Sequence, residues 1–270
     1  MTDLLRIVLG GDPLASVAVA FLKANLALGV AILLVAALRA PVRRMVGAAT
    51  AYRLWWAPLL AAGLAPLGDV VSGAADPIVM AAAARPHLLQ NAAWTWAVGF
   101  GLLAVVFTLA QARFHVQVRA GRAGPAAVGF IAPRIIMPTD DGVFTPAERE
   151  LIRAHEREHV ARKDPRSLAV ATLLQCLCWF NPLAHLAAGL LRLDQELACD
   201  AAVILRRPGA RGLYARTLLK SQMLMRPAPL ACGWLALGAH PLELRIAQLR
   251  RAGPASSHSA VHAAGDAIRP

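Results

Sequence analysis

Charged residues are scarce in this sequence: 16% of its 270 residues are Asp, Glu, Lys or Arg, whereas 57% are hydrophobic. A mean hydropathy of +0.52 is too high for an ordinary soluble domain and indicates membrane-spanning segments. Acidic residues are the scarcer class, 16 against 28 basic residues, so the formal net charge is +12. Much of the basic charge flanks apolar runs, as in cytoplasmic loops of membrane proteins, so we expect no direct nucleic-acid binding.

Cysteine is also rare, and its four copies form no C-x-x-C pattern. We interpret them as buried, reduced thiols: Cys176, Cys178, Cys199 and Cys232. The first nine residues lack a basic region, and no Ala-x-Ala cleavage site follows them. We therefore expect the first apolar run to be a retained span and not a cleaved signal peptide.

Three long apolar runs lie in the first part of the chain, at residues 16–38, 54–71 and 93–112. Each is close to the length that a helix needs to cross a bilayer. Tryptophan pairs open the second and third runs, which is typical of the membrane interface. The sequence thus predicts a membrane domain over residues 1–112.

Arginine is distributed unevenly between these runs. The first connection holds Arg39, Arg43, Arg44 and Arg53, the second holds Arg85, and Arg113, Arg119 and Arg122 follow the third run. Because basic loops remain in the cytoplasm, this bias predicts an outside N-terminus and a cytoplasmic region after the third run. We expect an integral, multi-pass protein of a bacterial plasma membrane.

The chain changes character after the third run. Residues 113–252 are expected to form a cytoplasmic α+β domain, with short strands at 116–118 and 126–137. The tail 253–270, rich in Ala, Gly, Ser and His, is expected to be disordered. The predicted fold class is a mainly α membrane protein with three N-terminal transmembrane helices.

A clear helix start lies at Thr145, with Pro146 at the first helical position and Glu148 three residues after the cap. This signal predicts a helix from Pro146 to about Arg162. Further helices are expected over 196–205 and 211–225.

The predicted helix carries the sequence His155-Glu156-Arg157-Glu158-His159. Residues four apart share a helical face, so both imidazoles can reach one metal ion. The intervening Glu156 can act as general base in this H-E-x-x-H arrangement of zinc peptidases. The alternative is a solvated, charged helix face.

A catalytic zinc needs a third protein ligand, for which Glu196 is the candidate, with Asp194 as a weaker rival. Asp200 lies on the same helical face as Glu196 and could orient a ligand histidine. The alternative for these carboxylates is a surface position or an arginine partner. His240, beside Pro241, is a possible transition-state donor, whereas His185 is interpreted as a buried, satisfied histidine.

An apolar segment at 167–193 separates the motif from Glu196. A single crossing there would leave Glu196 on the wrong side of the membrane. Asn181-Pro182 interrupts the segment, and proline forbids one continuous helix. We therefore expect a membrane-associated helical hairpin that returns Glu196 to the side of the motif. The basic pair Arg162-Lys163 could contact anionic lipid headgroups, although solvated arginine is the default.

The residues resemble a known family, the BlaR/MecR-type membrane metallopeptidases, over roughly 15–250. The resemblance is carried in order by VGFIAPRIIMP (128–138), HEREHVARKDP (155–165), WFNPL (179–183) and ELACD (196–200). The segments YRLWW (52–56) and LELRI (242–246) are similar as well.

The resemblance implies a gluzincin-like zinc domain that follows three spans. It implies His155, His159 and Glu196 as zinc ligands and Glu156 as general base. Asp200 would be the carboxylate that supports a ligand, and Asp164 a structural or supporting one.

The well-known sensors of the family carry a further span and an extracellular penicillin-binding domain. Here no apolar run of spanning length follows Arg226, and no serine has a lysine three residues on. We therefore expect no direct acylation by a β-lactam and no C-terminal sensor domain.

The sequence thus predicts a membrane-bound, Zn²⁺-dependent endopeptidase with a regulatory role. Its substrate would be a protein at the cytoplasmic membrane face, such as a transcriptional repressor or the chain itself. The alternative is a signalling or scaffold protein that keeps a non-essential zinc site. A protease of prenylated proteins is less favoured, because the hairpin is short. The sequence does not indicate which oligomeric state the protein has.

Overall fold

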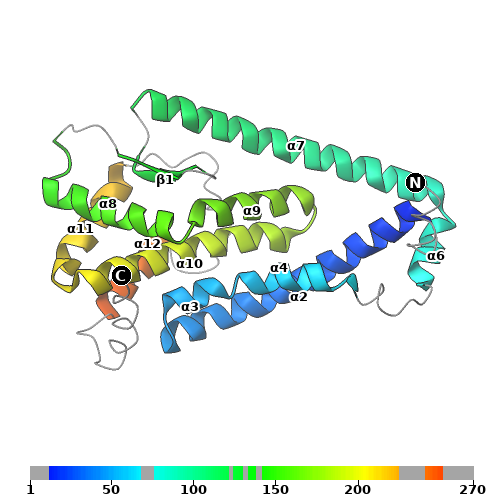
Figure 1. The fold of residues 1–270 in the computed structure, drawn as a ribbon, viewed down its shortest axis with the longest axis horizontal. Helices are drawn as coiled ribbons and strands as arrows, with labels where there is room; N and C mark the ends of the chain where they lie inside the picture. Colours follow the sequence, from blue (N-terminus) through cyan, green and yellow to red (C-terminus); the bar gives the residue numbers. More distant parts are fainter. Residues whose placement is uncertain are drawn as a thin grey trace, which may run out of the picture.

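The computed structural model describes residues 12–67, 76–121, 124–129, 133–137, 142–224 and 241–251. Within these ranges the fold is mainly helical, with one two-stranded sheet, as predicted. The molecule is elongated: α2 and α7, two long helices, lie close together at one end and separate toward the compact helical part that holds the H-E-x-x-H segment (Figure 1).

Two helices of the described residues are long and apolar enough to cross a membrane, α2 (Pro13–Met45) and α7 (Pro86–Arg119). Helix α2 starts at Asp12, whose carboxylate accepts the Leu14 amide at 2.9 Å, and its last turn carries basic residues. None of the most apolar stretch of α7 is buried within the chain. Such a surface is unfavourable in water, so both helices suit an apolar surrounding.

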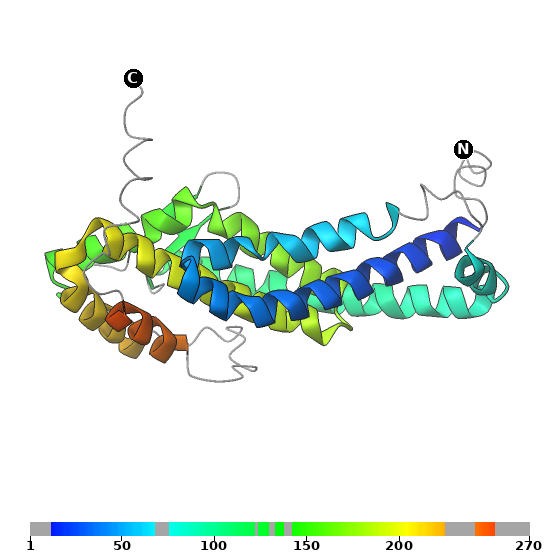
Figure 2. The ribbon, with the colours of Figure 1, turned by 90° about the horizontal axis from the view of Figure 1, so that it is seen from below.

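The second predicted span, 54–71, is not one long helix among the described residues. A turn separates α3 (Ala48–Arg53) from α4 (Trp56–Leu64), and α4 has nine residues, too few to cross a bilayer alone. Residues 68–75 lie outside the described ranges. Helix α4 packs along α2 (Figure 2). The short α6 (Pro77–Ala83), capped by Asp76, leads to α7.

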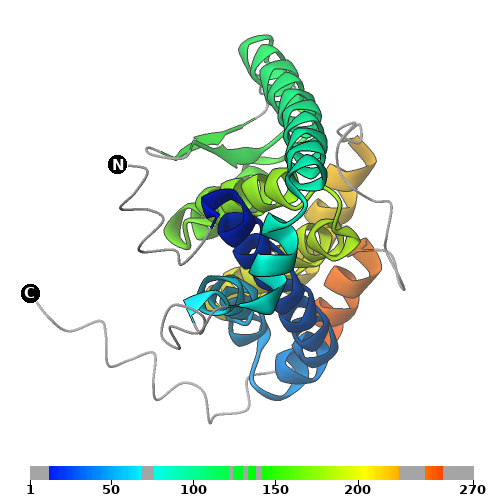
Figure 3. The same ribbon diagram turned by 90° about the vertical axis from the view of Figure 1, so that its right-hand side faces the viewer.

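The predicted strand at 116–118 is wrong, because these residues are the last part of α7. A three-residue alternation is too short to compete with extension of an established helix. The helix ends where Gly121 adopts a φ of +67°. The strands β1 (Ala126–Val128) and β2 (Arg134–Ile136) do form, antiparallel, with Ala127 opposite Ile135; Figure 3 shows this sheet beside α7.

The predicted helix at 146–162 is present as α8 (Pro146–Ala161), with the predicted capping box between Thr145 and Glu148. Four more helical segments follow: α9 (Asp164–Leu177), α10 (Pro182–Arg206), the short η1 (Pro208–Ala210) and α11 (Arg211–Leu224). Helix α12 (Pro241–Arg251) closes the fold. One apolar cluster joins α8, α10, α11 and α12 through Leu151, Val203, Ile204, Tyr214, Leu218 and Leu249.

The expected hairpin is formed by α9 and α10. The break falls at Asn181-Pro182, where the Asn181 side chain caps α10 by accepting the Leu183 amide at 3.0 Å. The tip of the hairpin packs against both long helices: the Phe180 ring lies 6.1 Å from Phe21 of α2 between centroids, and the Trp179 indole donates to the Trp96 carbonyl of α7 at 3.2 Å.

Candidate active site

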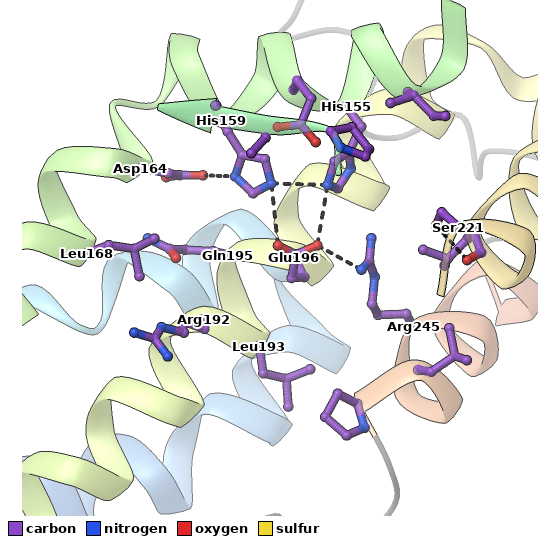
Figure 4. Close-up of a pocket in the computed structure, with 18 of the residues that line it drawn as sticks. His155, His159, Asp164, Leu168, Arg192, Leu193, Gln195, Glu196, Ser221 and Arg245 are labelled. Atoms are coloured by element: carbon purple, nitrogen blue, oxygen red, sulfur yellow. Dashed lines mark hydrogen bonds and ion pairs between the residues drawn. The ribbon is translucent and has the colours of Figure 1, made fainter. Parts of the chain in front are cut away.

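Helix α8 presents both histidines of the motif on one face, because they are four residues apart. The Nε2 atoms of His155 and His159 lie 3.0 Å apart. Both rings point into the space between α8 and α10 (Figure 4). The spacing predicted from the sequence therefore produces a shared face in the structure.

Glu196 of α10 faces this pair across the gap (Figure 4). Its carboxylate oxygens lie 3.3 Å from His155 Nε2 and 3.5 Å from His159 Nε2. Donors bound tetrahedrally to one zinc at about 2.0–2.1 Å are separated by about 3.3 Å. The three side chains thus present donor atoms with the separations that such an ion requires.

The bonds to the other ring nitrogens fix which nitrogen of each histidine is free. His159 Nδ1 lies 2.8 Å from Asp164 Oδ2, so it carries the proton and donates it. The Tyr214 hydroxyl donates to Asp200 Oδ1 at 2.6 Å and can therefore accept from His155 Nδ1 at 2.9 Å. Both Nε2 atoms then face Glu196. Repulsion between their lone pairs and the carboxylate is relieved by a metal cation or by a proton on His159, whose pKa the bonds to Asp164 and Glu196 raise.

Cys199 also lies near the histidines, and its sulfur together with one nitrogen of each ring lies within 4.8 Å. However, the sulfur contacts His159 Nδ1 at 3.2 Å, the nitrogen already bonded to Asp164. Burial raises the pKa of the Cys199 thiol to about 11, and the Arg162 guanidinium also contacts its sulfur. Glu196 is therefore the better third donor.

Arg245 of α12 supports both carboxylates of α10. It donates to Asp200 at 2.7 and 2.8 Å and lies 2.8 Å from Glu196 Oε2. Removal from bulk water opposes ionisation of Glu196, but Arg245 and the two histidines hold its pKa well below the usual range. Glu196 is therefore a carboxylate, the form that binds a cation.

Glu156 lies beside the histidines and is 7% exposed. Burial raises its pKa above the ordinary carboxyl value, while His155, His159 and the Ala127 backbone amide oppose the rise. The contact with Ala127 places β1 next to this carboxylate.

The site opens into a cavity of about 550 Å³. Its walls come from β1, α8, α9, α10, α11 and α12, and Ala127, Glu156, Leu193, Ser221 and Leu242 are among the residues that line it. A pocket of this size, largely apolar with a few converging polar groups, is typical of a substrate site.

Two other acidic residues of α10, Asp200 and Asp194, have different surroundings. Asp200 Oδ1 lies 3.5 Å from His155 Nδ1, and the Tyr214 hydroxyl joins the two through shorter hydrogen bonds. Asp194 does not approach the histidines: it is buried against Arg39, Arg43 and Trp55. His240 lies outside the described residues.

Asp164 takes the predicted supporting position beside His159. His185 is satisfied inside the hairpin by Gln175 and the Trp179 carbonyl, as expected. Three of the four cysteines are buried and free, as expected, and the fourth, Cys232, lies outside the described residues.

Sequence reasoning missed Tyr214 and the role of Arg245. No motif marks Tyr214, and its contact with His155 depends on how α11 packs on α8. Arg245 lies in the segment 242–246, which resembles a family element, and that resemblance was the only signal for it.

A helix with H-E-x-x-H that faces a carboxylate of a second helix is an arrangement found in metallopeptidases. The sequence profile of the family described as BlaR1 peptidase M56 matches residues 108–249, which include all the residues of this site. The chain belongs to this family.

A curated relative, the regulatory protein BlaR1 of Bacillus licheniformis, is 34% identical over 98 residues. The match covers 35% of this chain and 16% of the relative. The activity and partners of that whole protein are therefore only proposals for this chain. No solved structure matches the chain.

Proposed function

We propose that this chain is a membrane-bound, zinc-dependent endopeptidase in which His155, His159 and Glu196 hold the metal. The observation that carries the proposal is the convergence of donor atoms: the two Nε2 atoms lie 3.0 Å apart, His155 Nε2 lies 3.3 Å from Glu196 Oε2, and His159 Nε2 lies 3.5 Å from Glu196 Oε1. Two imidazoles and one carboxylate are a donor set that catalytic zinc uses, with one position left open. Asp164, Tyr214 and Arg245 would hold these donors in place.

A zinc ion held by these donors supplies Lewis acidity, which polarises a peptide carbonyl and lowers the pKa of a water molecule. Glu156 would accept a proton from the attacking water and return it to the leaving amine. Its burial favours this exchange, because a carboxyl group with a raised pKa holds a proton more readily. The walls of the cavity would exclude bulk water from the reacting bond.

The substrate would be a protein at the cytoplasmic face of the membrane, such as a transcriptional repressor, or another part of this chain. The apolar surfaces of α2 and α7 favour a membrane location, and the arginines in the last turn of α2 favour a cytoplasmic site. The three-span arrangement and the bacterial plasma membrane belong to this proposal. A regulatory role is favoured by the relationship to BlaR1.

A Glu156→Gln variant tests the catalytic part of the proposal. We expect it to bind as much zinc as the wild type, because Glu156 is not one of the three donors. We expect its cleavage rate to fall about 10²- to 10⁴-fold, because the proton acceptor is lost. The measurement is zinc-dependent self-cleavage of the purified full chain, together with cleavage of denatured, labelled casein.

The scaffold alternative makes the opposite prediction. If the chain acts only by binding a partner, wild type and Glu156→Gln would hold equal zinc and show equal, negligible cleavage. A matched Glu158→Gln variant controls for the loss of one carboxylate from the same helix, because Glu158 pairs with Arg206 on the other side.

A further inference from the structure

A second cavity, of about 380 Å³, lies between the membrane helices and the α9–α10 hairpin. Helices α2 and α4 form one side and α9 and α10 the other, with these helices lying close together in Figure 1. Apolar side chains make up most of its wall, including Ile32, Leu59, Leu174 and Ala187. Neither the donor triad nor Glu156 lines this cavity.

Basic residues gather at one end of the cavity, where the turn from α8 to α9 lies. Arg162, Lys163 and Arg166 line it there, together with the hydroxyls of Tyr52 and Ser167. Lys163 and Arg166 are exposed. The buried Nε of Arg162 has no hydrogen-bond partner within the described residues. This end of the cavity therefore suits an anion.

The polarity changes in the same direction along each wall. On α9, Leu174 lies eleven residues beyond Lys163, which is about 16 Å along a helix. On α4, Leu59 follows the tryptophans that open the helix, and on α2, Ile32 lies farther from the arginine-rich end. A basic mouth that leads into an apolar channel is complementary to an amphiphile with an anionic head.

We propose that this cavity binds one anionic phospholipid of the cytoplasmic leaflet. The phosphate would lie against Lys163, Arg166 and Arg162, and an acyl chain would extend along Val170 and Leu174. The proposal rests on the membrane placement of α2 in the proposed function. Basic pockets between membrane helices on the cytoplasmic side are suited to such headgroups.

The cavity also touches the support of the active site. The Tyr52 hydroxyl in its wall lies 2.9 Å from Asp164 Oδ1 and 3.0 Å from Ser167 Oγ. The other oxygen of Asp164 holds His159. A bound lipid would therefore contact Tyr52, which positions Asp164. Asp164 in turn is hydrogen-bonded to His159, a proposed metal ligand.

Native mass spectrometry of the purified full chain tests the proposal. The chain is incubated with phosphatidylglycerol or with phosphatidylcholine of the same acyl chains, and the retained lipid is counted. We expect one phosphatidylglycerol to be retained and phosphatidylcholine to be lost. Replacing Lys163 and Arg166 by Gln should weaken retention about fivefold for each cation removed.

Two further variants separate charge from shape. Val170→Trp keeps the basic end of the cavity but fills the apolar part beside it, so it should also reduce retention. Val170 is 39% exposed, so we expect the fold to tolerate the larger side chain. An Arg153→Gln, Arg216→Gln double variant removes the same charge from α8 and α11, outside the cavity, and should retain lipid as the wild type does.

Three results would overturn the proposal. The first is retention of phosphatidylcholine equal to that of phosphatidylglycerol. The second is a weakening of retention by the control pair equal to that by the Lys163 and Arg166 variants. The third is displacement of the lipid by glycerol phosphate at matched concentration, which would indicate a site for small anions. The Glu156→Gln chain is measured in parallel. Lipid retention does not depend on Glu156, so a failure of the peptidase proposal leaves this readout unchanged.

Discussion

Tyr214 connects two parts of the site through one hydroxyl group. It lies 2.6 Å from Asp200 Oδ1 and 2.9 Å from His155 Nδ1. Asp200 is fully buried, and Arg245 occupies both of its oxygens. The charge of Asp200 is thus balanced by Arg245. Because the Tyr214 hydroxyl donates its hydrogen to Asp200, the Tyr214 oxygen remains available as an acceptor for His155.

A Tyr214→Phe variant should therefore weaken zinc binding about 10–100-fold, the usual effect of losing a partner that orients a ligand histidine. The measurement is competition against a chelator of known zinc affinity. Tyr52→Phe is the matched control, since Tyr52 also loses a hydroxyl but contacts Asp164 and not a histidine. We expect a smaller loss from the control. Equal losses in both variants would contradict the role assigned to Tyr214.

At the scale of single residues, the sequence predicted those contacts that follow from position along one helix. His155 and His159 share a face for that reason, and so do Glu196 and Asp200. It could not predict Tyr214 or Arg245, because their contacts depend on where α11 and α12 pack. It ranked Glu196 above Asp194, but it could not predict that Asp194 faces Trp55 while Glu196 faces His155.

Helix α10 joins the membrane helices to the site. Near its middle, Asp194 accepts from Arg39 and Arg43 of α2 at 3.1 Å each and from the Trp55 indole at 2.9 Å. Glu196 follows two residues later on the face toward α8. The position of Glu196 is therefore set by contacts on both sides of one rigid helix. The sequence predicted the break that makes this possible, because proline acts locally on the backbone.

Helix α8 begins at a capping box that also carries an ion pair, Glu148 with Lys220 at 2.9 Å. The bond from Lys220 and the bonds from Thr145 lower the pKa of Glu148 below its ordinary value of 4.5. Ionised Glu148 therefore stabilises the folded state fully at a pH above its pKa in the unfolded chain, near 4.5. This stabilisation is lost as the pH falls through the lower pKa that Glu148 has in the folded chain. Helix α8 should therefore lose part of its anchoring in acid.

A Glu148→Gln variant keeps the capping geometry but loses the charge. We expect it to be less stable than the wild type at pH 7, with the difference shrinking as the pH falls below about 4.5. Thr145→Ala should cost about 1 kcal/mol at pH 7, and part of this cost should remain in acid, because the hydroxyl also accepts the Glu148 amide. Urea unfolding of chelator-treated protein at pH 7 and pH 3.5 measures both. A difference for Glu148→Gln that grows in acid would contradict the assignment.

At the scale of the molecule, α2 and α7 enclose the tip of the α9–α10 hairpin. Gly99 of α7 shows how close this packing is, because a Cβ there would overlap the Trp179 ring. Since Phe21 and Trp96 contact the tip within the apolar parts of both helices, the hairpin would enter the bilayer if these helices cross it. The sequence predicted the hairpin but not its depth, which depends on aromatic contacts between distant segments.

The three-span arrangement predicts that the two ends of the second apolar run lie on opposite sides of the membrane. Met45 and Ala84 are exposed positions that flank it. In a Cys232→Ala background, an impermeant maleimide should label Ala84→Cys in intact expressing cells and Met45→Cys only after permeabilisation. Labelling of both from the same side would mean that the segment between them does not cross.

The central claim is that Glu196 completes a metal site with His155 and His159. Elemental analysis of the purified full chain tests it most directly, with wild type, Glu196→Ala and Cys199→Ser prepared in parallel. We predict about one zinc per chain in the wild type and in Cys199→Ser, and little in Glu196→Ala. Equal zinc in wild type and Glu196→Ala, with zinc lost in Cys199→Ser, would contradict the claim.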